Sequence, residues 1–206
     1  TKLLEGSEEA KDLVMDSKFQ EVDKVLTLDY QSESIRDLLL EQLRQIRKVT
    51  NQTLCVLEYG TGNEEKTSLY RAALEPVDYT VSVFDPDVYE LTLEDGYDLI
   101  LCDQTLHRAK NIEKALANLQ SRLKKGGLLC FAESTEMTSL AYITTIFLRK
   151  EYTDIRANSL NMLVSHDTWH NLCKESGFRM VWEWQDDGRL SGVSAFCLQN
   201  EQTHLA

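Results

Sequence analysis

Short apolar runs alternate with stretches of helical apolar spacing along most of this chain. The apolar-rich runs are 54–60, 79–84, 97–102 and 128–132, and each has the length and composition typical of a buried strand. Apolar residues three and four positions apart predict helices over 8–49, 65–74, 111–123, 136–150 and 166–176. Strands that alternate with helices indicate a parallel sheet with helices on both faces.

The first long helical stretch lies before the first strand. Its apolar stripe consists of Ile35, Leu38, Leu39, Gln42, Leu43 and Ile46. Ser32 or Ser34 is in a position to cap its start. We therefore expect an N-terminal helical lead-in or lid over residues 1–50.

The later helices and strands end with recognisable signals. The helix over 111–123 is expected to end in Lys124-Lys125 with Gly126 after it, because cations and glycine favour a helix C-terminus. Residues 181–184 and 193–198 predict a closing antiparallel pair of strands with a turn at 186–188. The expected core domain is 51–199, and the expected frayed tail is 200–206.

Composition narrows the possible partners. The 206 residues carry a net charge of −12, with 34 Asp and Glu against 22 Lys and Arg. Such an acidic surface repels phosphate backbones and anionic lipid, so we expect neither nucleic acid nor a membrane as partner. No apolar run is long enough for a bilayer span and the first residues show no signal peptide, which favours a cytoplasmic location. The scattered cysteines are expected to be buried free thiols: Cys55, Cys102, Cys130, Cys173 and Cys197.

A glycine-containing loop joins the strand at 54–60 to the following helix. Its sequence, from Glu58 through Gly60 and Thr61 to Gly62, follows a buried strand and opens a helix. Glycines there let the backbone approach a nucleotide-like ligand, and ligands bind α/β sheets at the carboxyl ends of their strands. The same residues are also compatible with a tight turn that binds nothing.

Several segments, in order, resemble one protein family. Residues 56–62 (VLEYGTG) resemble motif I of S-adenosylmethionine-dependent methyltransferases. Residues 97–107 (YDLILCDQTLH) and 123–133 (LKKGGLLCFAE) resemble segments of the C-methyltransferase domains of polyketide synthases and mixed polyketide/peptide synthetases. Shorter similarities occur at 3–6, 28–32, 154–156, 163–169 and 176–178, so the resemblance covers nearly the whole chain.

The resemblance implies a fold and a site. The implied fold is α/β: a Rossmann-like class I methyltransferase fold, with a mostly parallel sheet, an antiparallel terminal hairpin and an N-terminal helical lead-in. In the family a His–Glu dyad serves the chemistry, and the matching residues are His107 and Glu133, while Tyr30 lies where the family has an active-site tyrosine. Methylation of the α-carbon of a β-ketoacyl thioester needs a base, and a histidine held by a carboxylate can act as one near neutral pH. Alternatively, His107 caps the next helix and Glu133 only ends a strand.

The resemblance also implies a cofactor, S-adenosylmethionine. The matching cofactor-binding positions are Glu58, Gly60, Thr61, Gly62, Asp85, Asp103 and Gln104. Asp85 matches either the ribose-side or the adenine-side acid. No metal is expected, because His166 and His170 have helical metal-binding spacing without a third ligand.

Two departures set this chain apart from the family pattern. The third glycine of motif I is replaced by Glu64. The interval from Gly62 to Asp98, which normally holds two strands and two helices, has room for one helix, one strand and a short polar stretch. About one αβ unit, and with it part of the adenosine pocket, is therefore expected to be missing.

Three interpretations follow from these features. The first is a degenerate, non-methylating structural domain of a polyketide or hybrid peptide megasynthase, and the chain begins at Thr1 rather than Met, as a piece of a longer protein does. The second is an active C-methyltransferase that acts on a carrier-protein-bound β-ketoacyl thioester with His107 as base. The third is a cofactor-independent α-carbon epimerase that uses the same dyad. The implied partners are an acyl or peptidyl carrier protein and neighbouring domains, and S-adenosylmethionine is the cofactor if the pocket is competent.

Overall fold

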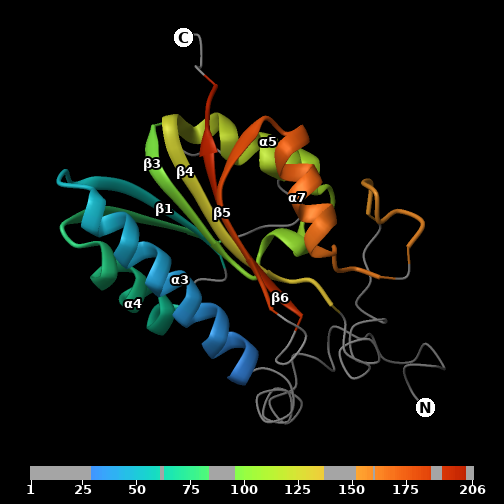
Figure 1. Cartoon of the computed structure of the whole chain (residues 1–206), viewed down its shortest axis with the longest axis horizontal. Coiled ribbons are helices and arrows are strands. Elements are labelled where there is room, and N and C mark those ends of the chain that lie inside the picture. The colour runs from blue at the N-terminus through green and yellow to red at the C-terminus, as the bar shows by residue number, and fades with distance from the viewer. Residues whose placement is uncertain are drawn as a thin grey trace.

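The computed structural model describes residues 29–60, 63–83, 96–136, 152–159, 161–186 and 192–202. Residues 29–32 are described by their backbone only. The described residues form one mixed sheet between two layers of helices (Figure 1). In chain order, the elements are α3 (Asp29–Val49), β1 (Leu54–Gly60), α4 (Glu64–Leu74), β2 (Val77–Val83), β3 (Tyr97–Asp103), the 3-10 helix η2 (Leu106–Arg108), α5 (Ile112–Arg122), β4 (Leu123–Ser134), α7 (His166–Glu175), β5 (Phe178–Gln185) and β6 (Val193–Asn200).

The described sheet has six strands in the order β2-β1-β3-β4-β6-β5. The first four are parallel to one another, and β6 is antiparallel to both β4 and β5. Glu58 of β1 pairs with Leu101 of β3, and Asp103 pairs with Ala132 of β4. The last residues of β1, β3 and β4 therefore lie beside one another at one edge of the sheet, which we call the carboxyl edge.

Each face of the sheet has its own apolar core. Helices α3 and α4 cover one face, and α5 and α7 cover the other (Figure 1). Successive strand residues point to opposite faces, so Val56 of β1 packs in the α3/α4 core while Leu57 packs in the α5/α7 core. Because both faces are covered, β1 and β3 are buried along almost their whole length, as their apolar-rich sequences indicated.

Most of the predicted elements are confirmed, and several of their boundaries differ from those predicted. Helix α3 begins at Asp29, so Ser32 and Ser34 lie inside it rather than at a cap. Asn200, expected in the frayed tail, is the last residue of β6 and is fully buried. Strand β4 begins at Leu123, so Lys124 and Lys125 belong to a strand and not to a helix end. The predicted helical segments at 8–28 and 136–150 and the turn at 186–188 lie wholly or mostly outside the described residues.

The early start of β4 has a visible cause. Leu123 pairs with Tyr97 at the beginning of β3, and the register then shifts between Tyr97 and Leu99. The Nζ atom of Lys124 lies 2.8 Å from Oδ1 of Asp98, whose other carboxylate oxygen accepts the Cys55 N–H at 2.9 Å. These contacts hold Lys124 along the sheet, although its place in the sequence, after a helix and before two glycines, also suits a helix end.

The first half of the sheet is short. Between β1 and β3 the described residues contain α4 and β2, and residues 84–95 lie outside them. Strand β2 is consequently the edge strand of the described sheet. Among the described residues, the strand that leads to the dyad, β3, is the third along the chain.

The cysteines match the expectation of free thiols, and that of burial for all but Cys55. All five cysteines are free, and four of them are buried. The Sγ atoms of Cys130 and Cys197 lie 3.3 Å apart across β4 and β6. No helix among the described residues is long and apolar enough to cross a membrane.

Gly127 should be required by the packing of β4, whereas Gly60 should not. A Cβ atom on Gly127 would lie 3.0 Å from the carbonyl oxygens of Lys124 and Tyr97, and 3.3 Å from that of Asp98. We expect Gly127→Ala to lower the free energy of unfolding by about 1–3 kcal/mol, because backbone atoms must move to relieve the contacts. Urea denaturation measures this change.

Gly60→Ala is the matched control, because its Cβ would meet its nearest neighbours at ordinary contact distances of 3.7 and 3.9 Å. We expect its free energy of unfolding to change by no more than about 0.5 kcal/mol. Equal losses in the two variants would contradict the assigned backbone contacts.

Candidate functional site

A histidine and a buried glutamate meet at the carboxyl edge. His107 lies in η2 directly after β3, and Glu133 lies near the end of the neighbouring strand β4. The Nδ1 atom of His107 is 2.5 Å from Oε2 of Glu133. The glutamate side chain is completely buried, whereas that of the histidine is 21% exposed. The structure thus brings the predicted dyad together.

Glu133 is held so that only one of its oxygens serves the histidine. Its Oε1 accepts the backbone N–H groups of Thr105 at 2.9 Å and Leu106 at 2.6 Å. These two backbone N–H groups can only donate, so the buried carboxylate acts as the acceptor. An ionised carboxylate accepts only, so Nδ1 of His107 carries the hydrogen and its Nε2 keeps a lone pair. Among the described residues, none forms a hydrogen bond with Nε2, and the ring is therefore arranged as a base.

Gln104 supports the turn that carries the dyad. Its backbone has a φ of 51°, in the left-handed region, and its N–H donates to Ala132 O at 2.9 Å. Its side chain exchanges two hydrogen bonds with Ser134, through Ser134 Oγ at 2.9 Å and Ser134 N at 3.1 Å. Predicted as a cofactor contact, Gln104 here ties the end of β3 to the end of β4.

An arginine that sequence reasoning did not single out lies behind the histidine. Arg156 is 2% exposed, and its Nη1 donates to the carbonyl oxygen of His107 at 2.6 Å. It also forms an ion pair with Asp154, whose carboxylate accepts the Ile112 N–H at the start of α5. Burial alone raises the pKa of Asp154, but the hydrogen bonds from Arg156 and Ile112 outweigh it and hold that pKa below its ordinary value.

Glu58, the motif I acid at the end of β1, is bonded on both of its oxygens. Thr67 of α4 donates to Oε1 at 2.9 Å, and the hydroxyl of Tyr79 of β2 donates to Oε2 at 2.7 Å. Burial and the nearby carboxylate raise the pKa of Tyr79 well above its ordinary value, so this phenol stays a donor. Glu58 itself is 5% exposed.

Asp103, at the end of β3, is bonded by two more side chains of α4. Lys66 Nζ lies 2.6 Å from Oδ2, and the Tyr70 hydroxyl donates to the same atom at 2.8 Å. Burial and Asp103 together raise the pKa of Tyr70 well above its ordinary value. The other oxygen of Asp103, Oδ1, is buried and has no hydrogen-bond partner among the described residues.

The start of α4 is capped by its own side chains. Asn63 Oδ1 accepts the Lys66 N–H at 3.1 Å, which makes Asn63 the N-cap. Glu64, in place of the third motif glycine, and Glu65 follow in the first turn, and both are exposed. Carboxylates there offset the positive end of the helix dipole, which would otherwise attract an anionic ligand group.

The predicted site residues divide into two groups. Those that the structure places together at the carboxyl edge are Glu58, Gly60, Asp103, Gln104, His107 and Glu133. Thr61, Gly62 and Asp85 lie outside the described residues, and Tyr30 is described only as part of the backbone of α3. Sequence reasoning missed Lys66, Tyr70, Tyr79 and Arg156, although 154–156 was among the segments of family resemblance.

The two histidines of α7 interact with a carboxylate. His170 Nδ1 lies 2.8 Å from Oε2 of Glu183, and His166 Nε2 lies 3.5 Å from the same atom. No group of three or more His, Cys, Asp or Glu side chains suited to a metal ion is found in the part of the chain that the structure describes.

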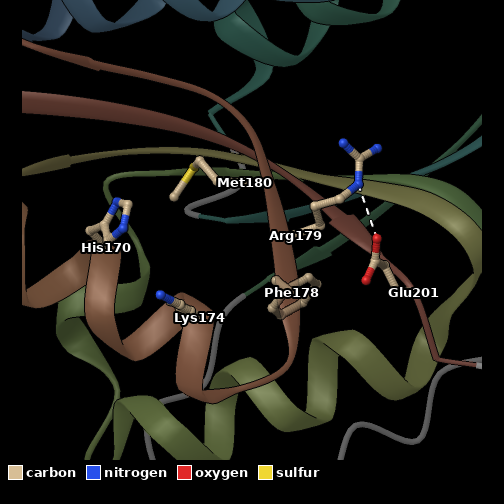
Figure 2. A pocket seen from close by; sticks show the side chains of 6 residues that line it. All are labelled: His170, Lys174, Phe178, Arg179, Met180 and Glu201. Atoms are coloured by element: carbon tan, nitrogen blue, oxygen red, sulfur yellow. Dashed lines mark ion pairs between the residues drawn. The ribbon is translucent and has the colours of Figure 1, made fainter.

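A groove of about 350 Å³ lies at the opposite edge of the sheet, where α7 ends and β5 begins (Figure 2). Its lining residues are His170, Lys174, Phe178, Arg179, Met180 and Glu201. Two of its three basic side chains already pair with carboxylates: Arg179 with Glu201 at 3.0 Å, and His170 with Glu183. This groove therefore lacks the convergent unpaired groups of a catalytic site, which leaves the carboxyl edge as the candidate.

A mostly parallel sheet with a closing antiparallel pair and a His–Glu dyad at its carboxyl edge defines a methyltransferase-like α/β domain. The sequence profile of a family described as "Methyltransferase domain" matches residues 28–183. The chain belongs to this family. The curated relatives below are polyketide synthases or a hybrid of one, which confirms the resemblance seen in the sequence.

Two curated proteins and one solved structure illustrate the similarity. Compactin nonaketide synthase, polyketide synthase component, of Penicillium citrinum is 34% identical over 88 residues, which are 42% of this chain and 3% of that protein. The hybrid PKS-NRPS synthetase xenE of Xenoacremonium sinensis is 25% identical over 118 residues, which are 56% of this chain and 3% of that protein. The CurJ carbon methyltransferase superposes with a TM-score of 0.76 at 17% identity, covering 98% of this chain and 63% of that one. At that identity, the superposition shows the fold.

Proposed function

We propose that this chain is a non-methylating, structural methyltransferase-like domain of a polyketide or hybrid peptide megasynthase. The observation that carries the proposal is the pairing of Asp103 with Lys66 at the carboxyl edge. S-adenosylmethionine is a sulfonium cation, and Asp103 matches a position of the family's cofactor site. In this chain, that carboxylate is already neutralised by an ammonium group 2.6 Å away.

Charge and existing hydrogen bonds at this edge both oppose a cationic adenosyl ligand. A sulfonium about 4 Å from the Lys66 ammonium would be repelled by about 4 kcal/mol at an effective dielectric constant of about 20. This energy corresponds to close to a thousandfold in affinity. Each oxygen of Glu58 already accepts a hydrogen bond, one from Thr67 and the other from Tyr79, so a ligand hydroxyl would have to share this acid with them. The first turn of α4 presents Glu64 where the ligand's own carboxylate needs a positive helix end. Only Asp103 Oδ1, buried without a partner among the described residues, favours a ligand donor.

The context of the domain rests on the curated relatives. This chain spans 3% of the length of the two polyketide synthases compared above, so it corresponds to one small part of a multidomain enzyme. We infer that it packs among neighbouring catalytic domains of such an assembly. A carrier protein is the partner that would bring an acyl group to the dyad.

S-adenosylmethionine should not bind to the unmodified protein with micromolar affinity. Lys66→Met removes the ammonium and leaves the buried Asp103 carboxylate uncompensated, so we expect this variant to bind the cofactor at least tenfold more tightly than the parent. Isothermal titration calorimetry measures both affinities, and circular dichroism checks that the variant is folded.

Lys174→Met is the matched control, because it removes an equal charge at the far edge of the sheet. Its affinity for S-adenosylmethionine should equal that of the parent. Micromolar binding by the parent, followed by methyl transfer to a β-ketoacyl carrier protein, would instead support an active C-methyltransferase.

The dyad supports a second function, cofactor-independent proton exchange at an α-carbon. The observation that favours it is the 2.5 Å contact between His107 and Glu133, whose geometry does not depend on any cofactor contact. In the proposed step, Nε2 of His107 takes the α-proton of a β-ketoacyl thioester. The electron pair of the broken C–H bond moves into the enolate, and the imidazolium stabilised by Glu133 later returns a proton to either face. The net result is exchange or epimerisation, without oxidation or group transfer.

This second function predicts deuterium exchange without added cofactor. A β-ketoacyl group on a carrier protein, incubated in D₂O with the chain, should gain deuterium about 10²–10⁴-fold faster than without it, which is the usual range for one positioned base. His107→Ala should return the rate, followed by mass spectrometry, to the uncatalysed value.

His170→Ala is the control, since His170 of α7 also contacts a glutamate, Glu183 of β5, at 2.8 Å, but is not part of the dyad. It should exchange as fast as the parent. Exchange by His107→Ala at the parent's rate would exclude the dyad as the base and leave the structural role alone.

A further inference from the structure

His107 is bonded through both its backbone and its side chain. Arg156 binds its carbonyl oxygen, and Glu133 binds its ring. We propose that Arg156 is a positioning residue that fixes His107 in register with Glu133. The inference concerns the geometry of the dyad and needs no turnover, so it stands or falls separately from the functions proposed above.

The guanidinium binds both ends of the short turn that carries the histidine. Its Nη1 donates to His107 O and its Nη2 donates to Ala109 O, each at 2.6 Å. A three-residue 3-10 helix leaves its last carbonyl groups without partners inside the helix, and buried carbonyls need donors. Arg156 supplies these donors from a position that is 2% exposed.

Asp154 attaches the same arginine to the next helix. Its Oδ2 accepts from Arg156 Nη2 at 2.5 Å and from the Ile112 N–H, at the start of α5, at 2.9 Å. Thr153 N donates to Lys110 O at 2.9 Å. Residues 107–112 are therefore bonded at both ends to one turn, 153–156, which lies more than forty residues later in the chain.

The geometry requires an arginine rather than any cation. A guanidinium presents its donors in a planar fork, which lets one side chain reach two carbonyl oxygens and a carboxylate together. A lysine ammonium can keep the ion pair with Asp154 but cannot span both carbonyls. The ring of Tyr152 stacks over the guanidinium, with 3.9 Å from the arginine Cζ to the ring centroid, and restricts its tilt.

The consequence is a histidine fixed from two sides. Glu133 is anchored independently by the N–H groups of Thr105 and Leu106, so the carboxylate stays in place when Arg156 changes. The His107 backbone, in contrast, loses a buried donor. We therefore expect loss of the Nδ1–Oε2 contact in a protein that is otherwise folded.

Arg156→Lys tests this inference by nuclear magnetic resonance of the histidine rings. In the parent, the Nδ1 proton of His107 should give a downfield, slowly exchanging signal. In folded Arg156→Lys this proton should exchange with solvent at least tenfold faster. The ring signals of His170, which is bonded to Glu183 and has no contact with Arg156, serve as the internal control and should not change. An unchanged His107 proton in a folded variant would overturn the inference.

A measurement on the parent protein covers the case in which Arg156→Lys does not fold. The Nε proton of Arg156 and the Nδ1 proton of His107 belong to one bonded unit, so native-state hydrogen exchange should release them with the same protection factor. A His107 proton that exchanges more than tenfold faster than the Arg156 proton would show that the arginine does not hold it.

Discussion

A completely buried carboxylate, Glu133, organises the functional half of this fold. A charge taken out of water costs several kcal/mol unless donors replace the lost hydration, and three groups do so here: two backbone N–H groups after β3 and the ring of His107. All three donors belong to residues 105–107, so the glutamate of β4 dictates the path of the chain as it leaves β3. The dyad is thus a structural constraint of the sheet edge, whatever chemistry it serves.

The other carboxylates of the same edge are bonded mainly by side chains rather than by backbone N–H groups. Glu58 and Asp103 end β1 and β3, as the acids of a ligand site do, but side chains of α4 and β2 bond them from within the chain. Helix α4 brings Lys66 to Asp103, and this ion pair lowers the free-energy cost of burying the acid. The same ion pair weakens the attraction of Asp103 for a cationic ligand. Stability and cofactor binding therefore compete for the same oxygens, and the contacts described favour stability.

Sequence patterns predicted those features that are encoded by neighbouring residues or by a whole motif. The run from Leu54 to Gly60 has the apolar continuity of a strand covered on both faces, and its bounds are those observed. The dyad was predictable because the segments that contain His107 and Glu133 resemble the family's motifs, and adjacent parallel strands do bring these residues together. The bonds from Lys66 and Tyr70 to Asp103 were not, because they join side chains 37 and 33 residues apart and no local pattern specifies them. The start of β4 was missed because two lysines before two glycines suit a helix end equally well.

The central claim is that the chain's own side chains take the place of a cofactor beside an intact dyad. A crystal structure of the protein grown with saturating S-adenosylmethionine tests it most directly. We expect Lys66 still bonded to Asp103, Tyr79 still bonded to Glu58, and no adenosyl group between the ends of β1 and β3. An ordered adenosyl group at that edge, with Lys66 displaced from Asp103, would contradict it.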